Sequence, residues 1–462
     1  MLKDLRPHLR PTVLLAVPVV LSQLGHIMVS FVDSVLVGKI GTVELAAVSL
    51  GVNSTNVILI LGIGLSMGSV PLVAAADGRH DHPALARLLV SSVWLSVLAG
   101  LVLVGLGQLV PPLMHFLGQP PAVEALAAPW VRVISWSFLP LMVFQGFREF
   151  AEGLGLTRQA MWLSVLANVV NAALCYALVF GHWGAPALGL MGSAWATLMA
   201  RILMAVLMAA YVLLAPRLHT YRAAVHNWLP DAATLARLLG LGAPIGVQMA
   251  FEVGAFAAAA LMIGRLGAVS LAAHQVAINL ASITYMAASG ISAAATIRVG
   301  KLFGSGNLAG ARQAGFAAYL LGFAFMGTMA VLFIATRHVA PLLYSPAAGP
   351  DPAVVAQAAT LLLIAALFQV SDGLQVVGLG ALRGLEDVKV PSVVALLAYW
   401  AVALPLGYFL GIRMHWGAPG LWTGLLVGLS IVAGVLLLRF RRETAPGYVA
   451  ARRVAAEEPA AA

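Results

Sequence analysis

The five residues His182-Trp183-Gly184-Ala185-Pro186 recur unchanged as His415-Trp416-Gly417-Ala418-Pro419, 233 positions further along the chain. A second register lies upstream at an offset of 226 and matches Pro18, Gly38, Gly41, Leu45, Ala46 and Ala47 to Pro244, Gly264, Gly267, Leu271, Ala272 and Ala273. Chance does not produce two registers at almost the same offset. The chain therefore consists of two homologous halves, which we place at residues 1–229 and 230–462.

The composition is that of a membrane protein. Apolar residues make up 61% of the chain and charged residues 9%, whereas about 25% of a typical soluble domain is charged. A helix needs about 20 apolar residues to cross a bilayer. We predict an all-α integral membrane protein with twelve spans, six in each half, at about residues 12–37, 45–75, 88–112, 127–147, 160–181, 187–215, 238–263, 270–297, 313–335, 354–382, 391–411 and 418–438. Such internal repeats are typical of secondary transporters.

The basic residues predict the orientation. Twenty of the 26 Lys and Arg residues fall in predicted loops on one side, which includes the linker from Pro216 to Arg237 and the tail after Arg439. Cytoplasmic loops carry the excess of positive charge, so we expect both termini in the cytoplasm and the chain in the inner membrane. The net charge of +9 is explained by this bias and does not indicate nucleic-acid binding. We find no phosphate loop and no metal-ligand cluster.

Three acidic residues lie inside predicted spans. Glu252 and Asp372 are deep in theirs, and Asp33 is nearer the outer end of the first span. A charge at the bilayer centre costs about 2.5–3.5 kcal/mol on insertion scales, and such residues usually face a bundle interior or a water-filled cavity. The repeat gives none of the three an acidic counterpart. We interpret them as functional rather than as helix-packing residues.

Other polar residues in the spans have two interpretations. Asn171 suits an interhelical hydrogen bond or a ligand contact, and Gln275 and Asn279 share one helix face. Arg201, near the middle of the sixth span, is expected to pair with an acid or with backbone carbonyls. Glycines of the second and eighth spans are interpreted as close helix-packing positions; they are Gly51, Gly62, Gly64, Gly68 and Gly290. We interpret Arg148, Glu149 and Glu152 as solvated cytoplasmic charges.

The chain resembles the multidrug and toxic compound extrusion family over about residues 10 to 440. The resemblance is carried by Pro18, Gln23, Asp33-Ser34 and Gly38, by Pro244, Gln248, Glu252 and Gly264, by the run Ala272-Ala273-His274-Gln275-Val276-Ala277-Ile278-Asn279, and by Asn171, Asp372 and Arg383-Gly384. The set of three acids is similar to that of the NorM-type branch. The resemblance implies two six-helix lobes around a central cavity and exchange of lipophilic, often cationic compounds for Na⁺ or H⁺.

The resemblance also implies roles for particular residues. Asp33 and Asn171 match an amino-lobe polar site, and Glu252 and Asp372 match a carboxy-lobe cation site. Gln275 and Asn279 match a span that lines the cavity in relatives. The chain departs from the pattern in two places, because relatives often have Asn or Asp at the position of Cys175 and some have Tyr at the position of Phe368. Each departure removes an oxygen.

We therefore expect a cation-coupled multidrug efflux antiporter, with small-molecule drugs and membrane lipids as partners, no catalytic residues and no cofactor beyond the coupling ion. For that ion we favour Na⁺ at Glu252 and Asp372, with protonation of Asp33 as a separate event. We expect a monomer. A lipid-linked oligosaccharide flippase of the same superfamily is the alternative. It should carry several cavity cations, yet only Arg201 is embedded. The sequence contains no motif of a membrane enzyme, such as a nucleophile–base pair or a metal cluster, and no filter sequence of a channel.

Overall fold

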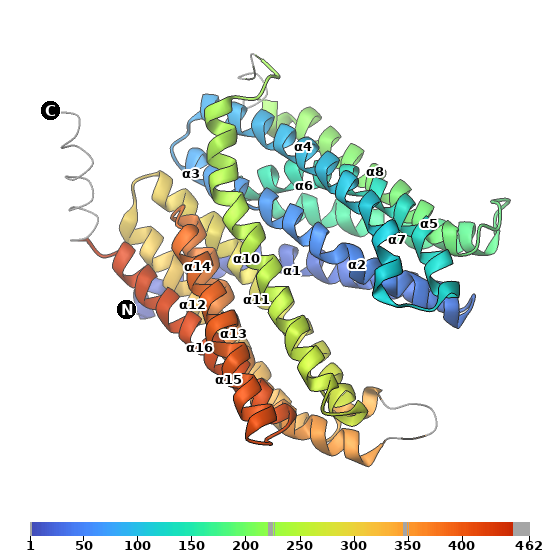
Figure 1. The fold of residues 1–462 in the computed structure, drawn as a ribbon. Helices are drawn as coiled ribbons and strands as arrows, with labels where there is room; N and C mark the ends of the chain where they lie inside the picture. The colour runs from blue at the N-terminus through green and yellow to red at the C-terminus, as the bar shows by residue number, and fades with distance from the viewer. Residues whose placement is uncertain (1, 220–224, 226, 345–348, 350, 447–462) are drawn as a thin grey trace. The chain divides into compact units, whose positions relative to one another are not determined.

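The regular secondary structure in the described part of the chain is helical (Figure 1). In this computed structural model, residues 2–219, 225, 227–344, 349 and 351–446 are described. The helices of the amino-terminal half are α1 (Leu2–Gly38), α2 (Thr42–Ser66), α3 (Ser69–Gly78), α4 (His82–Met114), η1 (His115–Leu117), α5 (Pro121–Trp136), α6 (Phe138–Gly153), α7 (Thr157–Phe180), α8 (Leu190–Leu214) and η2 (Pro216–Leu218).

The carboxy-terminal half repeats this pattern. Its helices are α10 (Ala232–Gly264), α11 (Ala268–Gly304), α12 (Leu308–Thr336), η3 (Ala340–Tyr344), α13 (Pro352–Gly384), α14 (Lys389–Leu397), η4 (Ala398–Ala403), α15 (Leu404–Tyr408), η5 (Phe409–Arg413) and α16 (Ala418–Glu443). Among the described residues, eleven helical stretches are long and apolar enough to cross a membrane. Helix α1, 37 residues long, covers the predicted first span. The predicted all-α membrane fold is confirmed.

Among the described residues, three spans are interrupted just before a proline. The break between α2 and α3 precedes Pro71, the break between α5 and α6 precedes Pro140, and the π-helical turn η4 precedes Pro405. Proline lacks the amide hydrogen that would bond to the carbonyl four residues earlier, and its ring collides with that carbonyl. Proline accounts for these breaks, although Pro18 and Pro244 lie inside the unbroken helices α1 and α10. Each of the first two breaks divides one predicted span into two helices.

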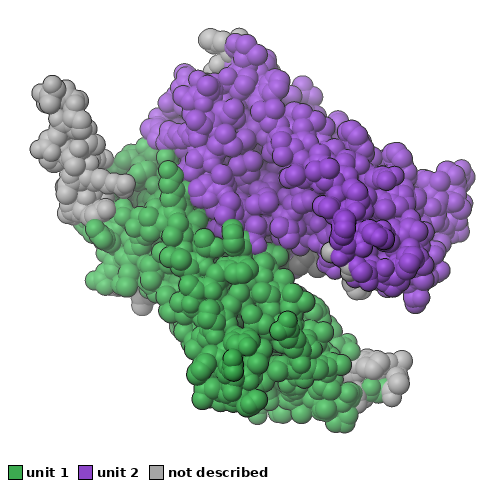
Figure 2. Space-filling model, viewed as in Figure 1, with its two compact units in different colours: residues 1–20, 251–462 green, residues 21–250 purple. Residues whose placement is uncertain are grey.

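The chain forms two compact units, Met1–Val20 with Phe251–Ala462 and Leu21–Ala250 (Figure 2). We call these unit 1 and unit 2. Their boundaries fall inside α1 and α10, the first helix of each half. The predicted lobes at residues 1–229 and 230–462 were divided by the sequence repeat, which is a different criterion, and that division stays a prediction. In packing terms, the start of each half belongs with the body of the other.

Glycines explain how those first helices pack. In unit 2, a β-carbon on Gly64 of α2 would collide with Gly246 of α10, and one on Gly68 would lie 2.6 Å from the Gly242 nitrogen. In unit 1, a β-carbon on Gly290 of α11 would collide with the Val20 side chain of α1. The repeat offset of 226 maps Gly64 onto Gly290 and Gly246 onto Val20. The same helix pair is therefore formed once in each unit, as expected for small residues at close membrane-helix contacts.

The linker enters α10 through a capped start. Asp231 Oδ2 accepts hydrogen bonds from the Thr234 amide (2.9 Å) and hydroxyl (2.5 Å), which hold the pKa of Asp231 below its ordinary value. Earlier in the linker, the Trp228 carbonyl accepts a hydrogen bond from Trp94 Nε1 of α4 at 2.8 Å. The linker is thus attached to unit 2 at Trp228 and ends where α10 begins.

Candidate functional site

Glu252 is part of a buried polar cluster in unit 1. Its Oε1 accepts a hydrogen bond from the Tyr399 hydroxyl at 2.9 Å and lies 3.3 Å from Gln375 Nε2. Gln375 Nε2 also lies 3.1 Å from the Tyr399 hydroxyl, so the three side chains form one network. They come from α10, α13 and η4. Tyr399 and Gln375 are almost completely buried, and Glu252 is 9% exposed.

Asp372 belongs to the same environment. It is 6% exposed on α13, and its charge interacts with that of Glu252. Tyr285 of α11 interacts electrostatically with both carboxylates. Two acids enclosed together repel when both are ionised, so a bound proton or cation lowers the energy of the pair. The structure thus brings together the two acids that the sequence predicts as a cation site, while their role stays a prediction.

Tyr399 supplies a hydroxyl oxygen beside Glu252 that was not predicted from the sequence. Phe368, one turn before Asp372, packs its ring against Phe256 and Trp422 with centroids 6.0 and 5.3 Å apart. The hydroxyl on Glu252 instead comes from a different span, where the π-helical turn η4 places Tyr399. Single π-helical turns are frequent at functional sites. Phe368 has no hydroxyl, but Tyr399 places one on Glu252 from another span.

The cluster offers oxygen ligands of three kinds: carboxylate, phenol and amide. No group of three or more His, Cys, Asp or Glu side chains able to hold a metal ion occurs among the residues that the structure describes. Any cation at this position would accordingly be held by Glu252 and Asp372 with neutral oxygens such as that of Tyr399. This arrangement suits an ion that binds and leaves, and Na⁺ at this pair stays a prediction.

Asp33 lies in a second polar cluster, in unit 2. Asn171 Nδ2 donates to Asp33 Oδ1 at 3.1 Å, and the Thr197 hydroxyl lies 3.5 Å from Oδ2. The Cys175 thiol also hydrogen-bonds to Asp33. Asn171 is 2% exposed, and its Oδ1 has no hydrogen-bond partner in the described part of the chain. The two residues that the sequence paired are thus in contact, with Thr197 and Cys175 completing the cluster.

Arg201 lies one helical turn after Thr197 on α8. Its Nη1 donates to the hydroxyl of Ser137 at 2.7 Å, at the break between α5 and α6. Its positive charge also interacts with that of Asp33. The sequence predicts a partner acid or backbone carbonyls for this arginine. The structure gives it a serine hydroxyl as hydrogen-bond partner and Asp33 as a nearby opposite charge.

Gln275 and Asn279 form a pair on α11, where Gln275 Nε2 donates to Asn279 Oδ1 at 3.0 Å. Gln275 is exposed in unit 1, whereas the adjacent His274 is buried and accepts a hydrogen bond from Trp422 Nε1 at 3.2 Å. The Ala-His-Gln run therefore presents its histidine to the core and its glutamine to the surface of the unit. The predicted role of Gln275 and Asn279 in a drug cavity stays a prediction.

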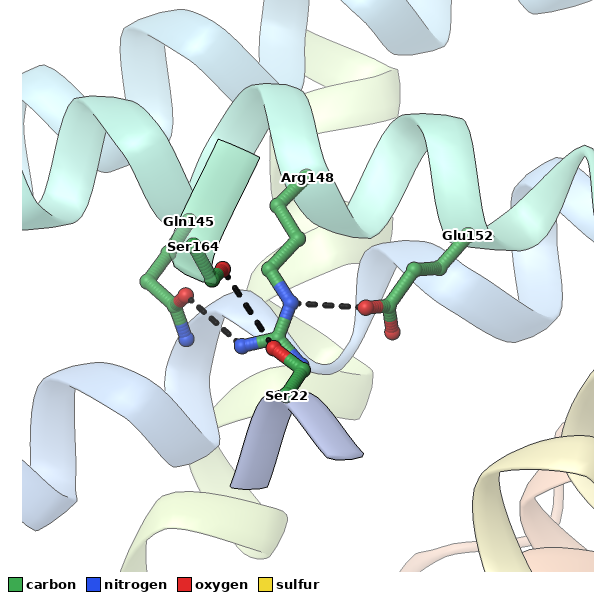
Figure 3. A network of polar contacts seen from close by, with 5 residues as sticks. All are labelled: Ser22, Gln145, Arg148, Glu152 and Ser164. Atoms are coloured by element: carbon green, nitrogen blue, oxygen red, sulfur yellow. Dashed lines mark hydrogen bonds and ion pairs between the residues drawn. The ribbon is translucent and has the colours of Figure 1, made fainter. Parts of the chain in front are cut away.

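The interpretation of Arg148, Glu149 and Glu152 as solvated charges was wrong. All three are about 95% buried near the end of α6. Figure 3 shows the Arg148 guanidinium between Gln145 and Glu152, with Nε donating to Glu152 Oε1 at 2.6 Å and Nη1 to Gln145 Oε1 at 3.3 Å. The figure also shows the hydrogen bond that joins Ser22 to Ser164. The four-residue spacing from Arg148 to Glu152 fits a solvated or a buried pair equally well, and packing of α6 against α3 and α4 decides between them.

Comparison with known proteins agrees with this architecture. The MatE family model matches the chain twice, at residues 18–177 and 244–409. The two matches begin at Pro18 and Pro244, the positions that the repeat pairs. The duplication that the sequence indicates is therefore confirmed as two copies of one family unit.

Curated relatives match nearly the whole chain. A protein named "Probable multidrug resistance protein NorM" from Rhizobium meliloti is 35% identical over 436 residues, 94% of this chain and 93% of that protein. One of the same name from Mesorhizobium japonicum is 37% identical over 443 residues, 95% and 94% of the two chains. Among solved structures, the "outward-facing conformation of a multidrug resistance MATE family transporter" matches with a TM-score of 0.85 at 19% identity and covers 94% of this chain and 95% of that one.

Proposed function

Because the chain belongs to the MatE family of multi-pass membrane transporters, we propose that it is a multidrug efflux antiporter coupled to a cation. In this proposal the chain exports lipophilic, often cationic compounds across the inner membrane by alternating access, in exchange for Na⁺ or H⁺. The relatives named as multidrug resistance proteins support the substrate class.

One observation carries the coupling part of the proposal. Glu252 and Asp372, which lack acidic counterparts in the other half, are buried together in unit 1 with the Tyr399 hydroxyl on Glu252. Ionisable residues inside a membrane are expensive to maintain and mark ion pathways and proton relays. Two carboxylates beside neutral oxygens have a use when a cation binds and leaves.

Binding can be converted into transport only through differential affinity. A ligand shifts an equilibrium between two conformations by the difference in its free energy of binding to them. In the proposed cycle, a cation from outside lowers the negative charge of the Glu252–Asp372 pair and favours the conformation in which this less charged cluster is enclosed. A cationic substrate favours the conformation in which the carboxylates are free to attract it. Coupling ion and drug therefore compete, and each promotes release of the other.

Proteoliposomes test the proposal directly. We expect purified protein to move ethidium, a lipophilic cationic dye, against its gradient when a Na⁺ gradient opposite to the dye flux is imposed at equal pH on both sides. Two carboxylates with neighbouring oxygens suit a hard cation, which is why Na⁺ should suffice. A response to a pH step but not to Na⁺ would make H⁺ the coupling ion. Indifference to both gradients would reject cation coupling.

The topology provides a separate prediction. Reporter fusions after residues 120, 230 and 462 should report outside, cytoplasmic and cytoplasmic positions, because twenty of the 26 basic residues lie in the predicted cytoplasmic segments. Paired phosphatase and fluorescent-protein fusions measure this in whole cells. A phosphatase-active fusion after residue 230 would overturn both the position of the linker and the six-span count of the first half.

A further inference from the structure

The cluster around Asp33 contains a positive charge of its own. We infer that Arg201 is an internal countercation for Asp33, a tethered guanidinium that takes the place of the coupling ion at this carboxylate whenever no ion or proton is bound there. The inference rests on the proposed coupled transport, because a countercation matters to coupling only if Asp33 binds the ion.

The first support is the arrangement on α8. Thr197 and Arg201 are four residues apart and therefore lie on one helix face. Thr197 approaches Asp33 to 3.5 Å, so Arg201 starts from the helix face that is nearest the acid, and its charge interacts with that of Asp33. Among the described side chains, the titratable or charged groups that interact with Asp33 are Cys175 on α7 and Arg201 on α8. With Asp33 ionised and the thiol neutral, Arg201 balances the charge of the cluster.

The second support is that Arg201 has an alternative partner. Its guanidinium donates to Ser137 at 2.7 Å, and Ser137 is completely buried at the break between α5 and α6. A long arginine side chain reaches one of two partners by rotating about its own bonds. Ser137 holds the guanidinium when Asp33 is neutral or bears an ion, and Asp33 attracts it when the carboxylate is bare.

The third support is an unsatisfied acceptor in the same cluster. Asn171 Oδ1 is buried and has no hydrogen-bond partner among the described residues. A buried polar atom without a partner is costly. It is satisfied when a cation or a guanidinium hydrogen approaches Asp33, which Asn171 already contacts through Nδ2 at 3.1 Å. The cluster is therefore built to receive one positive charge, and Arg201 is the resident candidate for it.

The countercation has a definite consequence for ion binding. It competes with the coupling ion or proton for Asp33, so it lowers the affinity of that site and lets an empty site be enclosed without a bare buried charge. A merely structural Arg201 would instead join α8 to the α5–α6 break through Ser137. The two roles predict different protonation of Asp33 when the Arg201 charge and the Ser137 hydroxyl are removed in separate variants.

Infrared titration of Asp33 in purified protein in lipid nanodiscs separates them. Each variant is measured against its own Asp33→Asn version, so that the difference reports protonation of this carboxyl alone. Arg201→Gln should move the protonation midpoint to higher pH by about 1 unit, the low end of the effect of an opposite charge close by. Arg201→Lys keeps the charge and should stay near the unchanged protein. Ser137→Ala frees the guanidinium to approach Asp33 and should move the midpoint to lower pH.

Two results would contradict the countercation role of Arg201. An unchanged midpoint in Arg201→Gln, or a shift of the same sign in Arg201→Gln and Ser137→Ala, would show that Arg201 only joins helices. If Arg201→Gln does not fold, Ser137→Ala still tests the inference, because that change removes no charge. The infrared signal does not require transport. Loss of coupling in proteoliposomes would reject the proposed function and leave the titration result standing.

Discussion

Glu252→Gln and Asp372→Asn will each abolish cation-coupled efflux and leave the inserted, folded protein near its normal abundance. Each change keeps the size of the side chain, replaces one accepting oxygen with a donating amide nitrogen, and removes one negative charge. Both acids are more than 90% buried, so the change lowers the desolvation cost of folding in the membrane. Loss of the charge removes the attraction for the coupling ion, and with it the differential affinity that drives exchange.

Efflux from proteoliposomes under an imposed cation gradient measures the effect, and membrane abundance is followed by a fluorescent fusion. Glu124→Gln on α5 is the matched control, because it makes the same chemical change at an acid whose side chain is 26% exposed and pairs with His115 at 3.7 Å. It should transport normally. Wild-type coupled transport by either buried variant would make that acid structural and reject the site.

Tyr399→Phe gives a graded version of the same experiment. It keeps both carboxylates and removes only the hydroxyl that contacts Glu252 at 2.9 Å. In the proposed site the phenol oxygen is also a neutral ligand for Na⁺, and the loss of a contact worth about 1.4 kcal/mol corresponds to about tenfold in affinity. Transport should therefore continue at a Na⁺ requirement raised about tenfold or more, which distinguishes an ion ligand from a distant helix contact.

The scaffold could be predicted from the sequence because its causes are local. Long apolar segments set the spans, and the repeat identified the duplication. The breaks before Pro71 and Pro140 were not predicted. Small residues such as Gly64 indicated close packing, and the structure places it against Gly246. Local patterns could not show that the first part of α1 and the first part of α10 each pack in the unit of the other half. Hydropathy indicates where a helix lies but not which neighbour it packs on.

The acids of the candidate site were predicted from the sequence, but two of their neutral hydrogen-bond partners, Tyr399 and Thr197, were not. Acids in apolar spans stand out because their cost is high. Tyr399 does not, since a tyrosine in a membrane segment is ordinary and its partner Glu252 is 147 positions away. The π-helical turn that directs Tyr399 inward is a property of backbone geometry around Pro405. Thr197 was missed for the same reason, because a hydroxyl carries no hydropathy signal strong enough to mark it.

Arg148→Met will destabilise the protein by about 3–5 kcal/mol, the usual cost of breaking a buried ion pair by removing one partner. The guanidinium donates to Glu152 at 2.6 Å and its charge is balanced by Glu149 and Glu152. Methionine fills similar space without a charge, so the variant leaves the Glu152 carboxylate buried without the guanidinium that neutralises it. Thermal unfolding of purified protein and abundance in the membrane should both fall.

The control for this experiment lies ten residues further on. Arg158→Met removes the same charge from an exposed position at the start of α7 and should be nearly neutral, as surface substitutions are. Adding Glu152→Gln to Arg148→Met should restore part of the loss, because it removes the buried charge that lost its ion-pair partner. Equal stability of the Arg148→Met and Arg158→Met variants would mean that water reaches the end of α6 and that these charges are solvated after all.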